Sequence, residues 1–102
     1  MSDRPSGPSG PPGEAPFDAE RRWRLHPRVA LRPEPFGALA YHYDNRRLNF
    51  LRSPDLVGLV EALDDHPNPR EAFAAQGIDE RRWPSFTRAL DLLARSDFLE
   101  AV

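Results

Sequence analysis

Hydrophobic and polar residues alternate along the first half of the chain, which predicts β-strands. The apolar run Val29 to Leu31 is short, and Pro33 and Pro35 after it favour an extended or turned link. Phe36 to Tyr43 and Arg46 to Leu51 both alternate, with the larger side chains on one face. Asp44 and Asn45 tolerate positive φ, so they predict a two-residue turn between these strands. The sequence therefore predicts three strands, the last two forming a hairpin.

The second half of the chain has the spacing of amphipathic helices. Ser53-Pro54-Asp55 combines an N-cap, a first-turn proline and an acidic residue, and the helix it starts is expected to end near residue 65. A shorter helix begins at Pro69 and stops at Gly77. Asp79 is a candidate cap for a third helix, whose regular part begins at Trp83 or Pro84. We therefore expect an α+β fold in which a three-stranded antiparallel sheet is followed by three helices and covered by them on one face.

Composition divides the chain of 102 residues into a tail and a domain. Of the 15 residues from 2 to 16, 11 are Ser, Pro or Gly. Such a segment buries too little apolar surface to offset the entropy of ordering it. We expect residues 1–16 to be a disordered tail and residues 17–102 to be one domain, compact from about residue 23.

Charge and cysteine content narrow the possible functions. The chain has no cysteine, which excludes disulfides, thiol nucleophiles and cysteine-bound iron–sulfur clusters. With 14 basic and 16 acidic side chains its net charge is −2, which argues against a nucleic-acid partner. The sequence contains no apolar run long enough for a membrane span and no signal peptide, so we expect a cytoplasmic protein without a membrane partner.

No motif in the sequence indicates catalysis, a metal or a cofactor. His26, His42 and His66 have spacings that match no local metal-binding motif. No phosphate-binding loop or nucleophile elbow is present, so we do not expect an enzyme. A small winged-helix DNA-binding regulator remains the alternative, with residues 80–96 as its recognition helix. The arginines of that segment are offset by acidic residues: Arg81, Arg82, Arg88 and Arg95 against Asp79, Glu80, Asp91 and Asp97.

The segments WRLHPRVAL (Trp23 to Leu31), RPEPFGALAYHY (Arg32 to Tyr43) and RRLNFL (Arg46 to Leu51) resemble the mycofactocin biosynthesis chaperone family. These proteins are similar to the PqqD-like recognition elements of ribosomally made, modified peptides. The resemblance runs from about Trp23 to Leu99. It implies a small fold of three strands and three helices, without catalytic activity or cofactor. It also implies two partners: a short precursor peptide, and a radical S-adenosylmethionine maturase that decarboxylates and crosslinks the peptide's C-terminal Val-Tyr.

The resemblance further implies that the peptide adds as a strand beside the third strand, in a groove lined by the third helix. A sheet edge supports this mode, because its unpaired backbone groups bind an extended peptide with little sequence demand. Leu48 and Phe50 lie either in this groove or in the core, and the pattern alone leaves both readings open. The implied peptide-binding residues are Arg46, Arg47, Leu48, Asn49, Phe50 and Leu51 of the strand and Trp83, Thr87, Leu90 and Ala94 of the helix.

Overall fold

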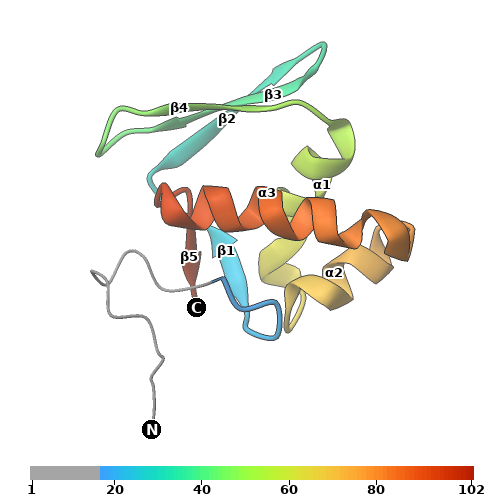
Figure 1. Cartoon of the computed structure of the whole chain (residues 1–102). Helices are drawn as coiled ribbons and strands as arrows, with labels where there is room; N and C mark the ends of the chain where they lie inside the picture. Colours follow the sequence, from blue (N-terminus) through green and yellow to red (C-terminus); the bar gives the residue numbers. More distant parts are fainter. Residues whose placement is uncertain (1–16) are drawn as a thin grey trace, which may run out of the picture.

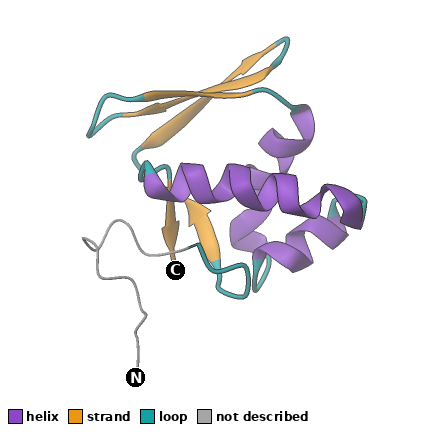
Figure 2. Cartoon of the chain, in the orientation of Figure 1, coloured by secondary structure: helices purple, strands orange, loops and turns teal. Residues whose placement is uncertain are grey.

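The computed structural model describes residues 17–102, which form two small antiparallel sheets and three helices (Figures 1 and 2). One sheet has the order β2-β3-β4 and the other pairs β1 with β5. The predicted α+β class is confirmed, and the tail predicted for residues 1–16 lies outside the described residues. The elements are β1 (Trp23–Leu25), β2 (Val29–Glu34), β3 (Gly37–His42), β4 (Leu48–Leu51), α1 (Pro54–Ala62), η2 (Leu63–Asp65), α2 (Pro69–Ala75), η3 (Glu80–Arg82), α3 (Trp83–Arg95) and β5 (Leu99–Ala101).

The three-stranded sheet contains the predicted hairpin, with a different turn. β3 and β4 pair antiparallel with Leu39 opposite Phe50. Residues 43–47 connect them, so the expected two-residue turn is wrong, and the positive φ of 62° falls on Arg46 and not on Asp44 or Asn45. β2 continues through Pro33 to Glu34, because β2 is an edge strand and an outward-facing proline costs it no ladder hydrogen bond.

Three side-chain caps set the starts of the helical segments. The Ser53 side chain accepts a hydrogen bond from the amide of Leu56 at 3.3 Å and begins α1, as the sequence predicts. Asn68 caps α2 through the amide of Glu71 at 2.9 Å. Asp79 caps the short helix η3, and α3 then starts at Trp83 with Pro84 in its first turn. The predicted start of the regular third helix is thus confirmed, whereas Asp79 caps the turn that precedes it.

The sheet of β1 and β5 is absent from the sequence-based prediction. Each strand has three residues, which is too short for alternation to be recognised. Trp23 lies opposite Ala101 and stacks on Phe17, with ring centroids 4.8 Å apart. This sheet joins the start of the described chain to its end.

The core lies between the three-stranded sheet and the helices. Ala38, Ala40 and Leu51 face inward from β3 and β4 and are each 1% exposed. The largest buried side chains from the helices and the α3–β5 segment include Leu59, Leu63, Phe73, Leu90 and Phe98. In Figure 1 the sheet lies above the helices, so its other face has no covering element in the described chain. No helix among residues 17–102 is long and apolar enough to cross a bilayer.

Candidate functional site: an open sheet edge beside a groove

Within residues 17–102, β4 is an edge strand whose outward backbone groups have no strand partner. The amide of His42 donates to the carbonyl of Arg47 at 3.0 Å, and these two residues lie opposite each other where the β3–β4 register continues beyond Tyr41 and Leu48. Hydrogen-bonded pairs alternate with non-hydrogen-bonded pairs along an antiparallel ladder. The amide of Asn49 therefore faces Ala40 of β3, and the amides of Leu48 and Phe50 face the open side. These two amides are free to pair with an added strand.

A groove of about 420 Å³ adjoins the end of β4. One wall is the junction between β4 and α1, and the other is η3 with the first half of α3. Leu56 and Phe86 give the groove apolar surface, while Ser53 and Ser85 supply hydroxyls. Its full lining is Arg52, Ser53, Leu56, Arg81, Arg82, Ser85, Phe86 and Ala89. A smaller hollow of about 180 Å³ next to it is lined by Phe36, Phe50 and Arg52.

Three arginines, Arg52, Arg81 and Arg82, lie along the rim of the groove. Arg82 lies 5.0 Å from the centroid of the Phe86 ring and pairs with Asp55 at 3.1 Å. Arg81 pairs with Asp79 at 3.2 Å. The pKa of Asp79 lies below its ordinary value, first because its side chain accepts hydrogen bonds from the Arg81 guanidinium and then because it accepts one from the Arg81 amide. Arg52 lies 5.4 Å from the Phe50 centroid and has no ion pair within residues 17–102, so its charge is free to meet a ligand's carboxylate.

The structure places the predicted strand residues in three different settings. Arg46 and Arg47 are exposed in the loop before β4, and Leu51 is buried in the core. Asn49 is half-buried on the inward side. Leu48 and Phe50 are 56% and 52% exposed on the outer face, so they are not core residues.

The four predicted helix residues share one stripe of α3, and this stripe faces inward. Leu90 is fully buried, and Trp83 packs on Phe73 with ring centroids 5.4 Å apart. Thr87 and Ala94 are half-buried on the same stripe. The helix face that borders the groove carries Ser85 and Ala89, which the sequence analysis did not select. The spacing in the sequence could have indicated this face, because Ser85 and Ala89 are four positions apart and therefore lie on the same side of a helix.

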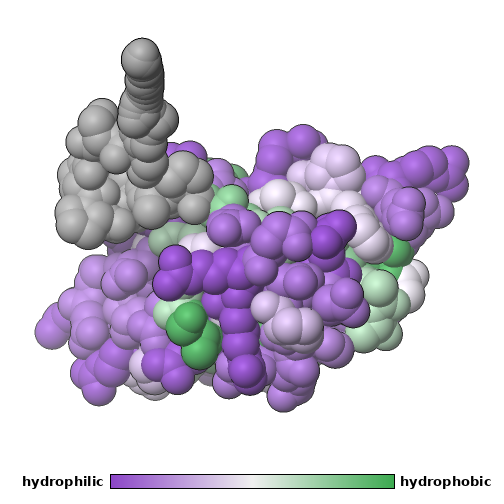
Figure 3. Space-filling model, turned by 90° about the horizontal axis from the view of Figure 1, so that it is seen from below, coloured by the Kyte–Doolittle hydropathy of each residue, from purple (hydrophilic) through white to green (hydrophobic). Residues whose placement is uncertain are grey.

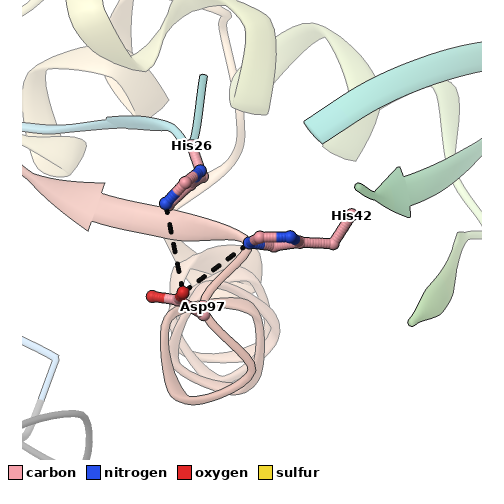
Figure 4. Close-up of side chains that lie close together, drawn as sticks. All are labelled: His26, His42 and Asp97. Atoms are coloured by element: carbon pink, nitrogen blue, oxygen red, sulfur yellow. Dashed lines mark ion pairs between the residues drawn. The ribbon is translucent and has the colours of Figure 1, made fainter. Parts of the chain in front are cut away.

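A second cluster, which the sequence analysis did not find, joins His26, His42 and Asp97 (Figure 4). The Nε2 atoms of His26 and His42 lie 4.0 and 3.6 Å from Oδ2 of Asp97. His42 is 1% exposed, and its Nε2 has no hydrogen-bond partner in the described part of the chain. The cluster brings together the β1–β2 link, the end of β3 and the turn between α3 and β5.

The hydrogen bonds of the two histidines make this cluster a poor metal site. Nδ1 of His26 accepts from the amide of Arg28 at 3.0 Å, and Nδ1 of His42 accepts from the amide of Asp44 at 3.1 Å. A neutral imidazole that accepts at Nδ1 carries its proton on Nε2. A metal-bound histidine shows the opposite arrangement, because it donates its remaining N–H to an acceptor. The Nε2 of His42 instead faces the Asp97 carboxylate, and the Nε2 of His26 lies between that carboxylate and Oε1 of Glu100, which is 3.8 Å away.

The arginines of η3 and α3 are largely committed to pairs within the chain. Arg81 and Arg82 pair with Asp79 and Asp55, and Arg95 pairs with Asp91 at 2.9 Å. A duplex-binding helix presents unpaired cations to phosphates. Three of the four arginines that the DNA-binding alternative would use are therefore paired with carboxylates of the described chain.

Comparison with known proteins identifies the class. Residues 22–100 match the model of the Peptide chaperone MftB family. The peptide chaperone MftB of Mycobacterium ulcerans (strain Agy99) is 46% identical over 87 residues, which cover 85% of this chain and 80% of the relative. The peptide chaperone MftB of Mycobacterium tuberculosis (strain ATCC 25618 / H37Rv) is 46% identical over 83 residues, covering 81% of this chain and 76% of the relative. No solved structure matches the chain.

The chain belongs to the peptide chaperone MftB family. The resemblance to mycofactocin biosynthesis chaperones, predicted from Trp23 to Leu99, is therefore confirmed. Because the family consists of peptide chaperones, the chain is a non-catalytic protein, as the sequence predicts.

Proposed function

We propose that this chain binds the mycofactocin precursor peptide as an added strand along β4 and presents it to the radical S-adenosylmethionine maturase. That enzyme then decarboxylates and crosslinks the peptide's C-terminal Val-Tyr. The observation that carries the proposal is the open edge of β4, with the outward amides of Leu48 and Phe50, directly beside a groove lined by η3 and α3. Backbone pairing gives affinity, and the groove gives selectivity.

The groove supports a particular kind of peptide side chain. Its apolar surface at Leu56 and Phe86 fits a hydrophobic residue, and Arg52 on the rim fits a carboxylate nearby in the peptide. In an extended peptide alternate side chains point to the same side, so the inward-facing set enters the groove. We therefore propose a bound segment that carries hydrophobic and acidic residues on its inward side.

Amide hydrogen exchange tests strand addition without altering the chain. The probe is a synthetic precursor peptide ending in Val-Tyr, added to the full chain. Exchange at Leu48 and Phe50 should slow by about tenfold or more, because each amide gains a hydrogen bond. Leu31 is the internal control, since its amide faces the open side of β2 at the other edge of the same sheet. Equal protection at Leu31, or protection confined to residues 64–70, would contradict the proposal.

A pair of matched substitutions tests the groove. Ala89→Glu places a carboxylate in the groove wall, while Ala74→Glu makes the same change at an exposed position of α2. Ala89→Glu should weaken peptide binding by about tenfold, a loss of about 1.4 kcal/mol, and Ala74→Glu should leave it unchanged. Isothermal titration provides the affinities, and circular dichroism shows whether both variants keep the fold. Equal affinities for the two folded variants would remove the groove from the site.

A further inference from the structure

The outer face of the three-stranded sheet is formed by two rows of side chains across the strands. The pairing registers put Ala30, Tyr41 and Leu48 in one row. A second row, two residues along, consists of Arg32, Leu39 and Phe50. Cross-strand neighbours at these positions share one face of the sheet. We call this surface, together with the adjoining Phe36 and Tyr43, the outer face.

The outer face holds most of the exposed large apolar side chains of residues 17–102. Phe36, Tyr43, Leu48 and Phe50, four of the six such residues, are 42–56% exposed there. The rings of Phe36 and Phe50 meet edge to face at 6.0 Å, and those of Tyr41 and Tyr43 do so at 5.3 Å. The opposite side of the molecule, seen from below in Figure 3, is mainly hydrophilic with separate apolar spots. Apolar side chains gathered in this way are typical of an interaction surface.

A peptide added at β4 leaves this face uncovered. Strand addition extends the sheet sideways, within its plane, whereas the side chains of the outer face project perpendicular to that plane. The outward side chains of the added peptide would instead enlarge the surface next to Leu48 and Phe50. If the proposed function holds, a protein resting on the outer face touches the chaperone and its peptide together.

The charges around this face indicate the kind of partner. Arg46, Arg47 and Arg52 lie beside β4 and have no ion pair within the described residues. A second copy pairing antiparallel at this edge, with Leu48 opposite the other Phe50, would put Arg46 opposite the other Arg52. Like charges directly opposite each other destabilise strand pairing. Residues 1–16 of the chain are also poor candidates, because Met1 is their only large apolar side chain.

We propose that the outer face docks the maturase, through a surface of that enzyme with an apolar centre and an acidic rim. This inference rests on the proposed function, in which the chain delivers the peptide to that enzyme. The peptide occupies the edge of the sheet and the enzyme its outer face. One small sheet then binds both partners at once, and the peptide's outward side chains face the enzyme.

The test separates the two partners by substitution. The double variant Tyr41→Thr/Tyr43→Ser removes two rings from the outer face and leaves the backbone edge of β4 unaltered. Val102→Ser is the matched control, because Val102 is 57% exposed and lies at the chain end far from the sheet (Figure 1). A purified radical S-adenosylmethionine maturase of mycofactocin biosynthesis and the synthetic precursor peptide are titrated separately against each variant. The double variant should bind the maturase about tenfold or more weakly and the peptide within about twofold of the parent, and Val102→Ser should match the parent for both.

Each other outcome has a distinct meaning. Unchanged maturase binding by the folded double variant overturns the docking surface, while peptide binding by the parent chain still supports the proposed function. Failure of the parent chain to bind the peptide overturns the proposed function alone, because maturase binding is measured separately. A parent chain that sediments as a dimer, together with a double variant that sediments as a monomer, assigns the face to a second copy and also overturns the inference. Arg47→Glu checks the rim, because Arg47 has no ion pair among the described residues: it should weaken maturase binding, and unchanged binding would contradict an acidic partner surface.

Discussion

The two edges of the three-stranded sheet differ in how many backbone groups they offer. At β2 the amide of Tyr43 donates to the carbonyl of Arg28 at 2.9 Å, which fixes the alternation of backbone hydrogen bonds along this strand. The backbone nitrogens of Val29, Leu31 and Pro33 therefore face the open edge, away from β3. Pro33 has no amide hydrogen, and the amide of Val29 donates to His26 at 2.9 Å. Among the contacts of residues 17–102, Leu31 alone keeps a free outward amide on this edge.

The β4 edge has neither form of protection. Leu48 and Phe50 both present outward amides, and no proline lies between Arg46 and Arg52. Edge strands are commonly protected by proline, because an open edge pairs with other chains. The two edges show that exposure alone does not make a binding edge. Within the described chain, the same sheet offers one free outward amide at the β2 edge and two at the β4 edge.

The largest expected effect comes from placing proline at adjacent positions of β4, where one variant should lose stability and the other should lose peptide affinity. Asn49→Pro removes the amide that faces β3, so it should cost about 3 kcal/mol or more and unfold much of the protein. Leu48→Pro removes an outward amide and should keep the fold while weakening peptide binding by about tenfold or more. Leu48→Ala, which keeps the amide, is the control for the lost side chain. A stably folded Asn49→Pro chain, measured by thermal denaturation, would show that the ladder alternation is assigned incorrectly.

A smaller effect is expected where β3 approaches the end of β4. Gly37 has φ of 148°, and a Cβ there would lie 2.1 Å from the carbonyl oxygen of Leu51. Gly37→Ala should therefore cost about 2–3 kcal/mol and displace the end of β4 from β3. Gly77→Ala is the matched control: its φ is 72°, but a Cβ there would meet no atom within 4 Å, so we expect about 1 kcal/mol. Chemical denaturation of both variants measures the difference, and equal losses would mean that Leu51 moves away without cost.

The hairpin and the helix starts were readable from the sequence because they depend on local chemistry. The Ser53 cap and the alternation of Phe36 to Leu51 act through neighbours a few residues away. The pairing of β1 with β5 was not readable, because it joins Trp23 to Ala101 across the whole domain. The cluster of His26, His42 and Asp97 was not predicted either, because its three residues are far apart in the sequence.

The candidate site, too, was predictable only where it depends on the local sequence. The strand that carries the open edge was predicted correctly as a strand, since its alternation is local. The helix face was harder, because Leu90 and Ala89 are neighbours in sequence and only tertiary packing decides which one points inward. The family resemblance supplied the element, and the structure turns Ser85 and Ala89, not Leu90, toward the groove.

The smallest expected effect concerns Asp79, which holds Arg81 at the groove beside β4. The pKa of Asp79 is lowered in the folded chain by its hydrogen bonds to Arg81, so the ionised form stabilises the fold. This contribution is fully present above the ordinary pKa of an aspartate and is lost as the pH falls through the lowered pKa of the folded state. Asp79→Asn keeps an oxygen that caps the Arg81 amide but removes the charge. Its melting temperature should lie slightly below that of the parent chain near neutral pH, and the two curves should meet in acid. Asp79→Ala also loses the cap and should melt lower at every pH. A gap between the Asn variant and the parent that persists below the lowered pKa would show that the carboxylate charge does not hold Arg81 in place.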